Sequence, residues 1–147
     1  MMSVPLPSMW GMTAPTPYLL LPGTARDALT FYGETFGCDV VLHTYDEFNR
    51  TDGPATLIAH GYLDDGPVAL FASDTAAGDP SLTCEGLMFA LLGEAPPATL
   101  HTWFTTLAEG GRIVDDLQPR PWGATDGQVI DRFGLHWLIG YEGEPTG

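Results

Sequence analysis

The chain has 147 residues, of which 44% are hydrophobic and 16% charged, as expected for one globular domain or two small fused modules rather than a disordered chain. It has 19 acidic and 5 basic residues, which give a formal net charge of −14, and every basic residue is an arginine. Such a charge repels phosphate backbones and anionic lipid, which excludes nucleic acid and membrane surfaces as expected partners. We interpret the acidity as a solubility feature, with a specific cationic partner as the alternative.

Cysteine usage and the N-terminal composition indicate the cellular setting. Cys38 and Cys84 form neither a C-x-x-C pair nor a Cys/His zinc spacing, so we expect free, buried thiols. Residues 1–16 are rich in proline and methionine, lack the cationic start and apolar core of a secretory signal, and are expected to be a flexible leader in which Trp10 docks. No apolar run is long enough to cross a membrane. We therefore expect a cytoplasmic protein.

The first predicted elements are a strand and a helix. Residues 18–21, YLLL, form a short apolar run before a Pro-Gly turn and predict a buried strand. Residues 24–37 predict a helix, because Thr24 and Asp27 have the spacing of a capping box and Gly37 supplies a left-handed stop. The apolar positions that fall on one face of this helix are Ala25, Ala28, Leu29, Tyr32 and Phe36.

Three strands are expected next, within residues 38–45, 55–63 and 67–73, with a turn over residues 64–67. The second half of the chain then predicts the same order of elements. A strand is expected within residues 86–93, a helix with prolines at its start and glycines at its end within 96–111, and strands within 112–117, 126–131 and 135–140.

The two halves are related by an internal repeat. An offset of 72 residues aligns positions 31–32 (Phe-Tyr) with 103–104 (Trp-Phe) and positions 19–20 (Leu-Leu) with 91–92 (Leu-Leu). Each half would form a sheet with one apolar face left to cover, so neither half is expected to be stable alone.

Two motifs resemble those of a known family. The opening Y-L-x-x-x-G followed by A-L-x-F-Y-x-x-x-F-G, and the tail W-G-A-x-x-G-x-x-x-D-x-F-G-x-x-W, resemble the vicinal oxygen chelate (glyoxalase, bleomycin resistance and dioxygenase) superfamily, and within it the PhnB-like branch. The resemblance covers residues 17–141. It implies an α+β fold with two tandem βαβββ modules, about 17–75 and 85–141, that form curled, half-barrel mixed sheets around a cavity, followed by a tail at 142–147.

The resemblance also implies a divalent metal held by His, Gln or Glu from matching strands, but the expected ligand positions are not filled. Counting from Asp131 places Leu138 where metal-binding relatives have a glutamate, and a leucine cannot coordinate a cation. The matching positions elsewhere fall near residues 16–17 and 86–87, where Glu85 is the one neighbouring carboxylate. We therefore expect no metal and no cofactor.

Four residues are candidates for ligand binding in the cavity. Strand alternation puts His136 and Leu138 on one face of the last strand, with Trp137 on the other. His136 and His60 could be pocket hydrogen-bonding groups or half-exposed strand residues. Trp122, between a proline and a glycine, could stack on a ligand at the cavity rim or pack in the core.

Other distinctive residues have structural interpretations. Gly127 and Gly134 are expected to adopt backbone conformations that side chains disfavour, with a tight turn at residues 131–134. Asp74 is expected to cap or orient a turn. The aromatic pair at 103–104 is expected in the core, and the histidines at 43 and 101 on the surface.

Three functions remain open at this point. The first is a homodimeric, metal-independent protein that binds an unidentified small molecule in its cavity. The second is a metal-dependent enzyme, a lyase of the glyoxalase type or a dioxygenase. The third is a dimeric scaffold without a ligand. The chain has no glycine-rich nucleotide loop for a methyl donor and no Arg/Lys cluster for a phosphonate, so neither chemistry is expected.

Overall fold

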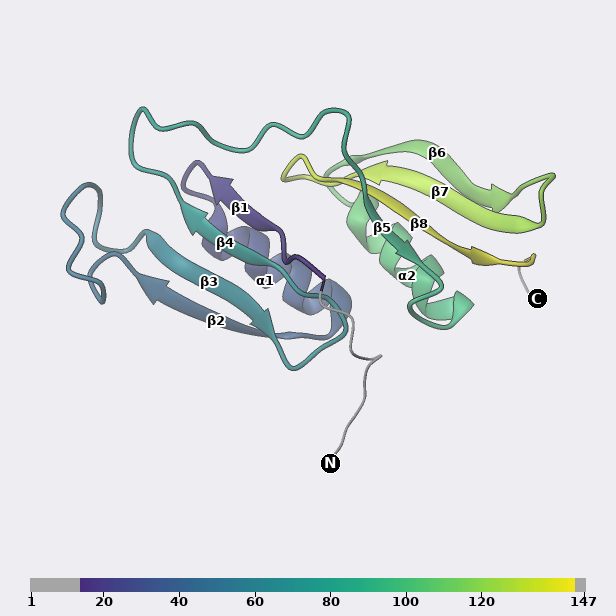
Figure 1. Ribbon diagram of the computed structural model, residues 1–147, viewed down its shortest axis with the longest axis horizontal. Helices are drawn as coiled ribbons and strands as arrows, with labels where there is room; N and C mark the ends of the chain where they lie inside the picture. Colours follow the sequence, from purple (N-terminus) through teal and green to yellow (C-terminus); the bar gives the residue numbers. More distant parts are fainter. Residues whose placement is uncertain (1–13, 145–147) are drawn as a thin grey trace.

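The computed structural model describes residues 14–144, so most of the expected leader, including Trp10, and the end of the tail lie outside the described residues. The predicted α+β class and the βαβββ order of each half are confirmed (Figure 1). The first module contains β1 (Tyr18–Leu21), α1 (Ala25–Phe36), β2 (Asp39–Thr44), β3 (Ile58–Asp64) and β4 (Phe71–Asp74). The second contains β5 (Phe89–Leu92), α2 (Pro97–Ala108), β6 (Arg112–Pro119), β7 (Ala124–Ile130) and β8 (His136–Glu142).

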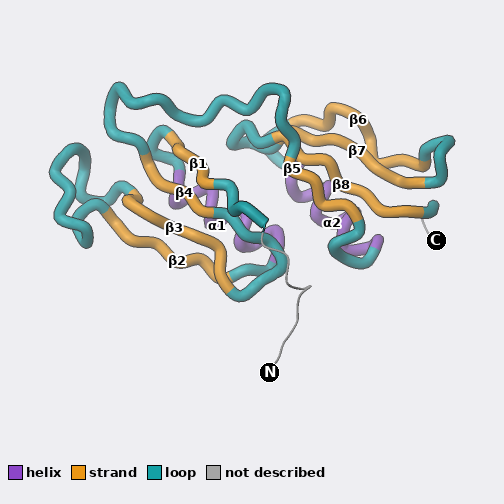
Figure 2. The backbone as a smooth tube through the Cα atoms, in the orientation of Figure 1, coloured by secondary structure: helices purple, strands orange, loops and turns teal. Residues whose placement is uncertain are grey.

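Each module forms its own four-stranded mixed sheet. The strand orders are β1-β4-β3-β2 and β5-β8-β7-β6, so the first and last strands of each module are parallel neighbours and the remaining pairs are antiparallel. Among residues 14–144, no strand of one sheet pairs with a strand of the other (Figure 2). The repeat is visible in the helices, since adding the offset of 72 to the bounds of α1 gives the bounds of α2.

A single apolar core joins the two modules. Each helix lies behind the sheet of its own module in Figure 1 and packs its apolar face against that sheet. The rings of Phe36 on α1 and Trp103 on α2 meet edge to face with centroids 5.0 Å apart, which connects the modules through their helices. Trp103 and Phe104 are buried, as predicted.

The predicted tight turn before β8 is a second connection between the modules. Asp131 is buried, and its carboxylate accepts hydrogen bonds from the Tyr32 hydroxyl of α1 at 2.6 Å and from the Trp137 indole N–H at 2.8 Å. The backbone N–H groups of Phe133 and Leu135 also donate to it, at 2.8 and 3.2 Å. One carboxylate thus closes its own turn and holds the other module's helix.

The start of α1 differs from the prediction. Thr24 is the N-cap residue, but its side chain makes no capping hydrogen bond. Instead, Asp74 at the end of β4 accepts the Ala25 N–H on Oδ1 at 2.9 Å and the Ile58 N–H on Oδ2 at 2.8 Å. Asp74 is 3% exposed, and the predicted capping or orienting role for it is confirmed. A carboxylate brought in from a distant strand replaces the local capping box, which sequence spacing does not reveal.

The two glycines of the tail motif have different roles. Gly134 has a φ of +92° in the turn, as expected. Gly127 does not have a positive φ, so the prediction that it adopts a conformation disfavoured by side chains is wrong. A Cβ at Gly127 would lie 2.6 Å from the backbone nitrogen of Leu117, so the absence of a side chain allows β6 and β7 to approach closely.

Smaller expectations are corrected by the packing. Cys38 and Cys84 are free, but each is half-buried rather than buried. His101 is half-buried, and its Nε2 lies 2.7 Å from the Tyr141 hydroxyl in a hydrogen bond that connects α2 to β8. His43 lies 3.6 Å from the Glu47 carboxylate. No helix in the described range is long and apolar enough to cross a membrane.

Both sheets have a face that no helix covers. On the first sheet, this face carries Tyr18 and Leu20, each 46% exposed. On the second sheet, it carries Leu92, which is 49% exposed. The alternating burial of β1 and β8 shows that the opposite face of each strand packs against the core. These open faces present apolar side chains to their surroundings.

Candidate functional site

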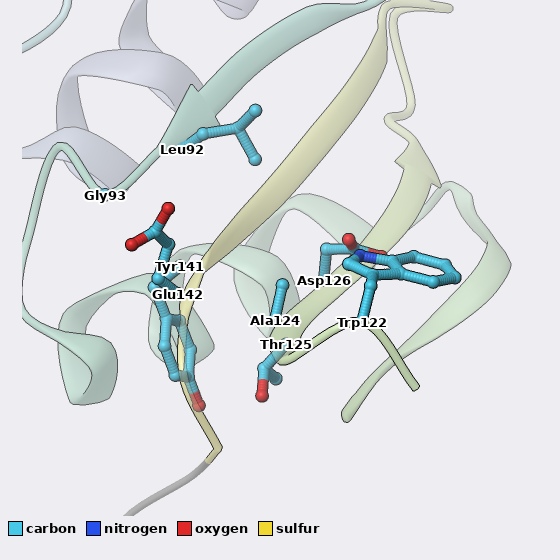
Figure 3. A pocket seen from close by; sticks show the side chains of 8 residues that line it. All are labelled: Leu92, Gly93, Trp122, Ala124, Thr125, Asp126, Tyr141 and Glu142. Carbon is cyan, nitrogen blue, oxygen red and sulfur yellow. The ribbon is translucent and has the colours of Figure 1, made fainter. Parts of the chain in front are cut away.

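A pocket of about 570 Å³ lies at one end of the second sheet, on its open face. It is formed by the ends of β5 and β8, the start of β7 and the turn that precedes β7 (Figure 3). Its volume is in the range of pockets that bind small molecules. The lining residues are Leu92, Gly93, Trp122, Ala124, Thr125, Asp126, Tyr141 and Glu142.

Trp122 stands on the wall of this pocket with 72% of its surface exposed. The turn that carries it is closed by the Arg120 N–H, which donates to the Ala124 carbonyl at 2.7 Å, and by the Gly123 N–H, which donates to the Arg120 carbonyl at 3.1 Å. Tryptophan is one of the more buried residue types on average, so an indole held in the open by an ordered turn is unusual. The core-packing alternative for Trp122 is therefore wrong.

The charged groups beside the pocket are mostly carboxylates. Arg120 donates from Nε to Asp126 Oδ1 at 2.8 Å and from Nη2 to Asp115 Oδ2 at 2.7 Å. The hydrogen bond to Asp126 is the main cause that raises the pKa of Arg120 above its ordinary value. Glu142, in contrast, forms no ion pair with the part of the chain that the structure describes. Three carboxylates against one guanidinium leave this end of the sheet with a net negative charge.

The structure places His136 and Leu138 on the same face of β8 as Glu142. Trp137 and Ile139 are buried on the opposite face, so the predicted alternation is confirmed. His136 Nε2 lies 2.9 Å from Gln128 Oε1 on the neighbouring strand, β7. Neither His136 nor Leu138 lines the pocket, because both lie nearer the start of β8, whereas the pocket is at the end of that strand.

His60 lies on the open face of the other sheet. Its Nδ1 is 2.9 Å from the Tyr18 hydroxyl, and its ring is 5.4 Å from that of Phe71, between ring centroids. Within the chain, His60 is therefore not brought into the pocket that Trp122 lines. His60 and Trp122 thus belong to different sheets, and a cavity that contains both stays a prediction.

Sequence reasoning missed the pocket's carboxylates. The sequence predicts that Glu142 begins the tail, whereas β8 extends to this residue. Strand alternation places His136 and Leu138 on one face, and the same alternation, continued past Gly140, also places Glu142 there. Asp126 gave no comparable signal, because its role depends on an ion pair with Arg120 across a turn.

The strand register shows which residues stand at the matching positions of the two sheets, and so whether their side chains could hold a metal ion. Leu138 pairs with Ala90 on β5, and the matching pair in the first sheet is Phe71 with Tyr18 on β1. The register therefore gives positions 18 and 90, and not the neighbourhoods of 16–17 and 86–87 that the sequence predicted. None of the four offers a carboxylate or an imidazole, and the Tyr18 hydroxyl is engaged with His60. In the described residues, no three His, Cys, Asp or Glu side chains are grouped so that they could hold a metal ion. The residues present do not fit the metal centre that the family resemblance implies.

Comparisons with known proteins agree with this fold. Residues 16–139 match the model of the Glyoxalase/Bleomycin resistance protein/Dioxygenase superfamily. The chain is 27% identical over 140 residues to Protein YjdN of Escherichia coli (strain K12), a match that covers 84% of this chain and 92% of that protein.

Two solved structures are similar over most of the chain. Protein PA1353 from Pseudomonas aeruginosa has a TM-score of 0.74 and 29% identity, covering 90% of this chain and 100% of that one. A PhnB protein from Bacillus cereus has a TM-score of 0.73 and 21% identity, covering 88% and 99%, and shares the fold. The chain belongs to the Glyoxalase/Bleomycin resistance protein/Dioxygenase superfamily and is similar to its PhnB-like members.

Proposed function

We propose that this protein binds a small organic molecule in the pocket at Trp122 and that binding does not require a metal. The observation that carries the proposal is the Trp122 indole, 72% exposed on the wall of a pocket of about 570 Å³. Ligand pockets combine apolar and aromatic walls with a few polar groups, and here Leu92 and Ala124 supply apolar surface and Glu142 a polar group.

We propose further that the protein acts as a homodimer. The open faces of both sheets expose large apolar side chains, including Tyr18, Leu20 and Leu92, and a second copy of the chain would bury them. Two facing sheets from different copies would form the curled half-barrel around a cavity that the family resemblance implies. In that arrangement, His60 of one copy could share a cavity with His136, Leu138 and Trp122 of the other.

The metal-dependent enzyme has less support. A lyase or dioxygenase of this superfamily would need a metal held by several ligands at once, and the register-matched positions Tyr18, Phe71, Ala90 and Leu138 offer neither a carboxylate nor an imidazole. The ligand-free scaffold accounts for the apolar faces but gives no reason for an ordered turn that holds Trp122 in the open.

The test is a screen of small organic molecules by thermal shift in EDTA, followed by titration of each hit against two variants. Trp122→Leu should weaken a true ligand by about 1–3 kcal/mol, because a stacked aromatic contact is lost. Phe48→Leu is the matched control, since Phe48 is 52% exposed and lies in the other module. Hits that bind equally to wild type and Trp122→Leu, or a screen without hits, would contradict the proposal.

A further inference from the structure

We infer that the ligand of the Trp122 pocket is a small organic cation that carries an apolar group. The inference rests on the proposed function, because it specifies the chemistry of the same pocket. Three features of the described residues support it: the charge of the lining, the exposed indole face and the apolar wall between them.

The charged residues that line the pocket are both acidic, Asp126 and Glu142. Arg120 lies beside them, but its guanidinium is already bound at 2.8 Å by Asp126 and at 2.7 Å by Asp115. Because two carboxylates hold this one cation, it has little charge left to offer a ligand. The Glu142 carboxylate has no ion-pair partner within residues 14–144 and is exposed. An anionic ligand would be repelled here, and a cation attracted.

The Trp122 indole adds a second attraction for a cation. The face of an indole attracts ammonium and guanidinium groups through its quadrupole, more strongly than the other aromatic side chains. Figure 3 shows Trp122 and Glu142 on opposite sides of the pocket, so a ligand that occupies the pocket lies between the ring and the carboxylate. Within the described residues, the Trp122 indole N–H donates no hydrogen bond, and 72% of the residue is exposed.

The remaining lining explains why the cation should be organic. Leu92 and Ala124 offer aliphatic surface, and Leu92 is 49% exposed. A bare metal ion would gain nothing from these groups, whereas an aryl or alkyl substituent would bury them. The net charge of −14 also favours the approach of cations from solution and disfavours anions.

The experiment compares three probes of similar size: phenyltrimethylammonium, its neutral isostere tert-butylbenzene, and the anion benzenesulfonate. Binding is followed by NMR on the tryptophan indole N–H signals, with the Trp122 signal assigned by its loss in Trp122→Leu. We expect phenyltrimethylammonium to bind roughly tenfold more tightly than tert-butylbenzene and to shift the Trp122 signal, and benzenesulfonate not to bind.

Two charge variants locate the attraction. Glu142→Gln should weaken binding of phenyltrimethylammonium by roughly threefold to tenfold. Glu34→Gln, an exposed position on α1 in the other module, changes the net charge by the same amount and should leave the dissociation constant unchanged.

The outcomes separate this inference from the proposed function. Equal affinities for the cation and its neutral isostere, both sensitive to Trp122→Leu, would overturn the cation class and leave small-molecule binding at Trp122 standing. Failure of phenyltrimethylammonium to bind, or binding that Glu142→Gln and Glu34→Gln weaken equally, would also overturn it. The proposed function would still be decided by whether the hits of the wider screen depend on Trp122.

Discussion

The hydroxyl of Tyr32 donates a 2.6 Å hydrogen bond to the carboxylate of Asp131, joining α1 of the first module to the turn before β8 of the second. Both residues are buried. Burial is the main cause that raises the pKa of Tyr32 above its ordinary value of 10.0, and the negative charge of Asp131 raises it further. The position of one module relative to the other therefore depends on a tyrosine that keeps its proton.

Replacing Tyr32 by Phe should lower the free energy of unfolding by about 2 kcal/mol near neutral pH, because a buried carboxylate loses a hydrogen-bond donor. Urea denaturation measures the loss. A change below about 0.5 kcal/mol would mean that the other three donors satisfy Asp131 without Tyr32.

The same pair predicts a dependence on alkaline pH. Above pH 10.0, the unfolded tyrosine releases its proton while folded Tyr32 keeps it, so the unfolded state is favoured as the pH rises. This contribution lowers the free energy of unfolding by about 1.4 kcal/mol per pH unit. Tyr32→Phe lacks it, so the difference in stability between the two proteins should shrink between about pH 9 and pH 11. If the free energies of unfolding of wild type and Tyr32→Phe change in parallel over this range, the pKa of folded Tyr32 is not raised.

Asp74→Asn should destabilise the protein by about 2 kcal/mol, because the amide that replaces one carboxylate oxygen faces a backbone N–H and cannot accept from it. Thr24→Ala is the control. Its hydroxyl makes no capping bond, so we expect a change within about 0.5 kcal/mol. If thermal or urea unfolding reverses this order, the local capping box, and not Asp74, holds the start of α1.

Gly127→Ala should cost about 3 kcal/mol, because the new methyl group would lie 2.6 Å from the backbone of Leu117 and force β6 and β7 apart. In Gly23→Ala the new methyl group meets no atom within 4 Å, and the cost comes from the strained φ of +84°. We therefore expect a loss of about 1 kcal/mol in the free energy of unfolding. Equal losses for the two variants in urea denaturation would show that the strands relax without cost.

The proposed dimer predicts a species of twice 15.8 kDa in sedimentation at micromolar concentration. Leu20→Glu, on the open face of the first sheet and outside the Trp122 pocket, should shift the equilibrium towards the monomer by placing a charge in the apolar contact. Glu34→Gln, on the outer side of α1, should leave it unchanged. A wild-type monomer at these concentrations would rule the dimer out.

Much of the fold could be predicted from the sequence, because the signals involved are local or periodic. The apolar face of residues 25–36, the proline start of α2 and the 72-residue repeat each depend on neighbouring positions. The alternation in β8 separated Trp137 from His136 correctly for the same reason. What could not be predicted depends on distant groups, such as the Asp74 carboxylate that replaces the local cap.

The candidate site was predicted less well than the fold. The position of Trp122 between a proline and a glycine predicts a residue at the rim of a cavity, and Trp122 lines the pocket. His60 could not be placed relative to Trp122, since strand patterns do not specify how two separate sheets are arranged. The ion pair of Arg120 with Asp115 and Asp126 sets the charge beside the pocket, and it forms across a turn and a bulged strand pair.

Thermal melting of the EDTA-treated protein tests the central claim, metal-independent binding at Trp122, most directly. A ligand from the screen at a hundred times its dissociation constant should stabilise the fold by about 2.7 kcal/mol and raise the melting temperature by roughly 5–10 °C. We predict this shift in EDTA, its loss in Trp122→Leu at the same ligand concentration, and no comparable shift with Mn²⁺, Fe²⁺, Ni²⁺ or Zn²⁺ alone. A ligand shift that appears only after one of these metals is restored would contradict the account.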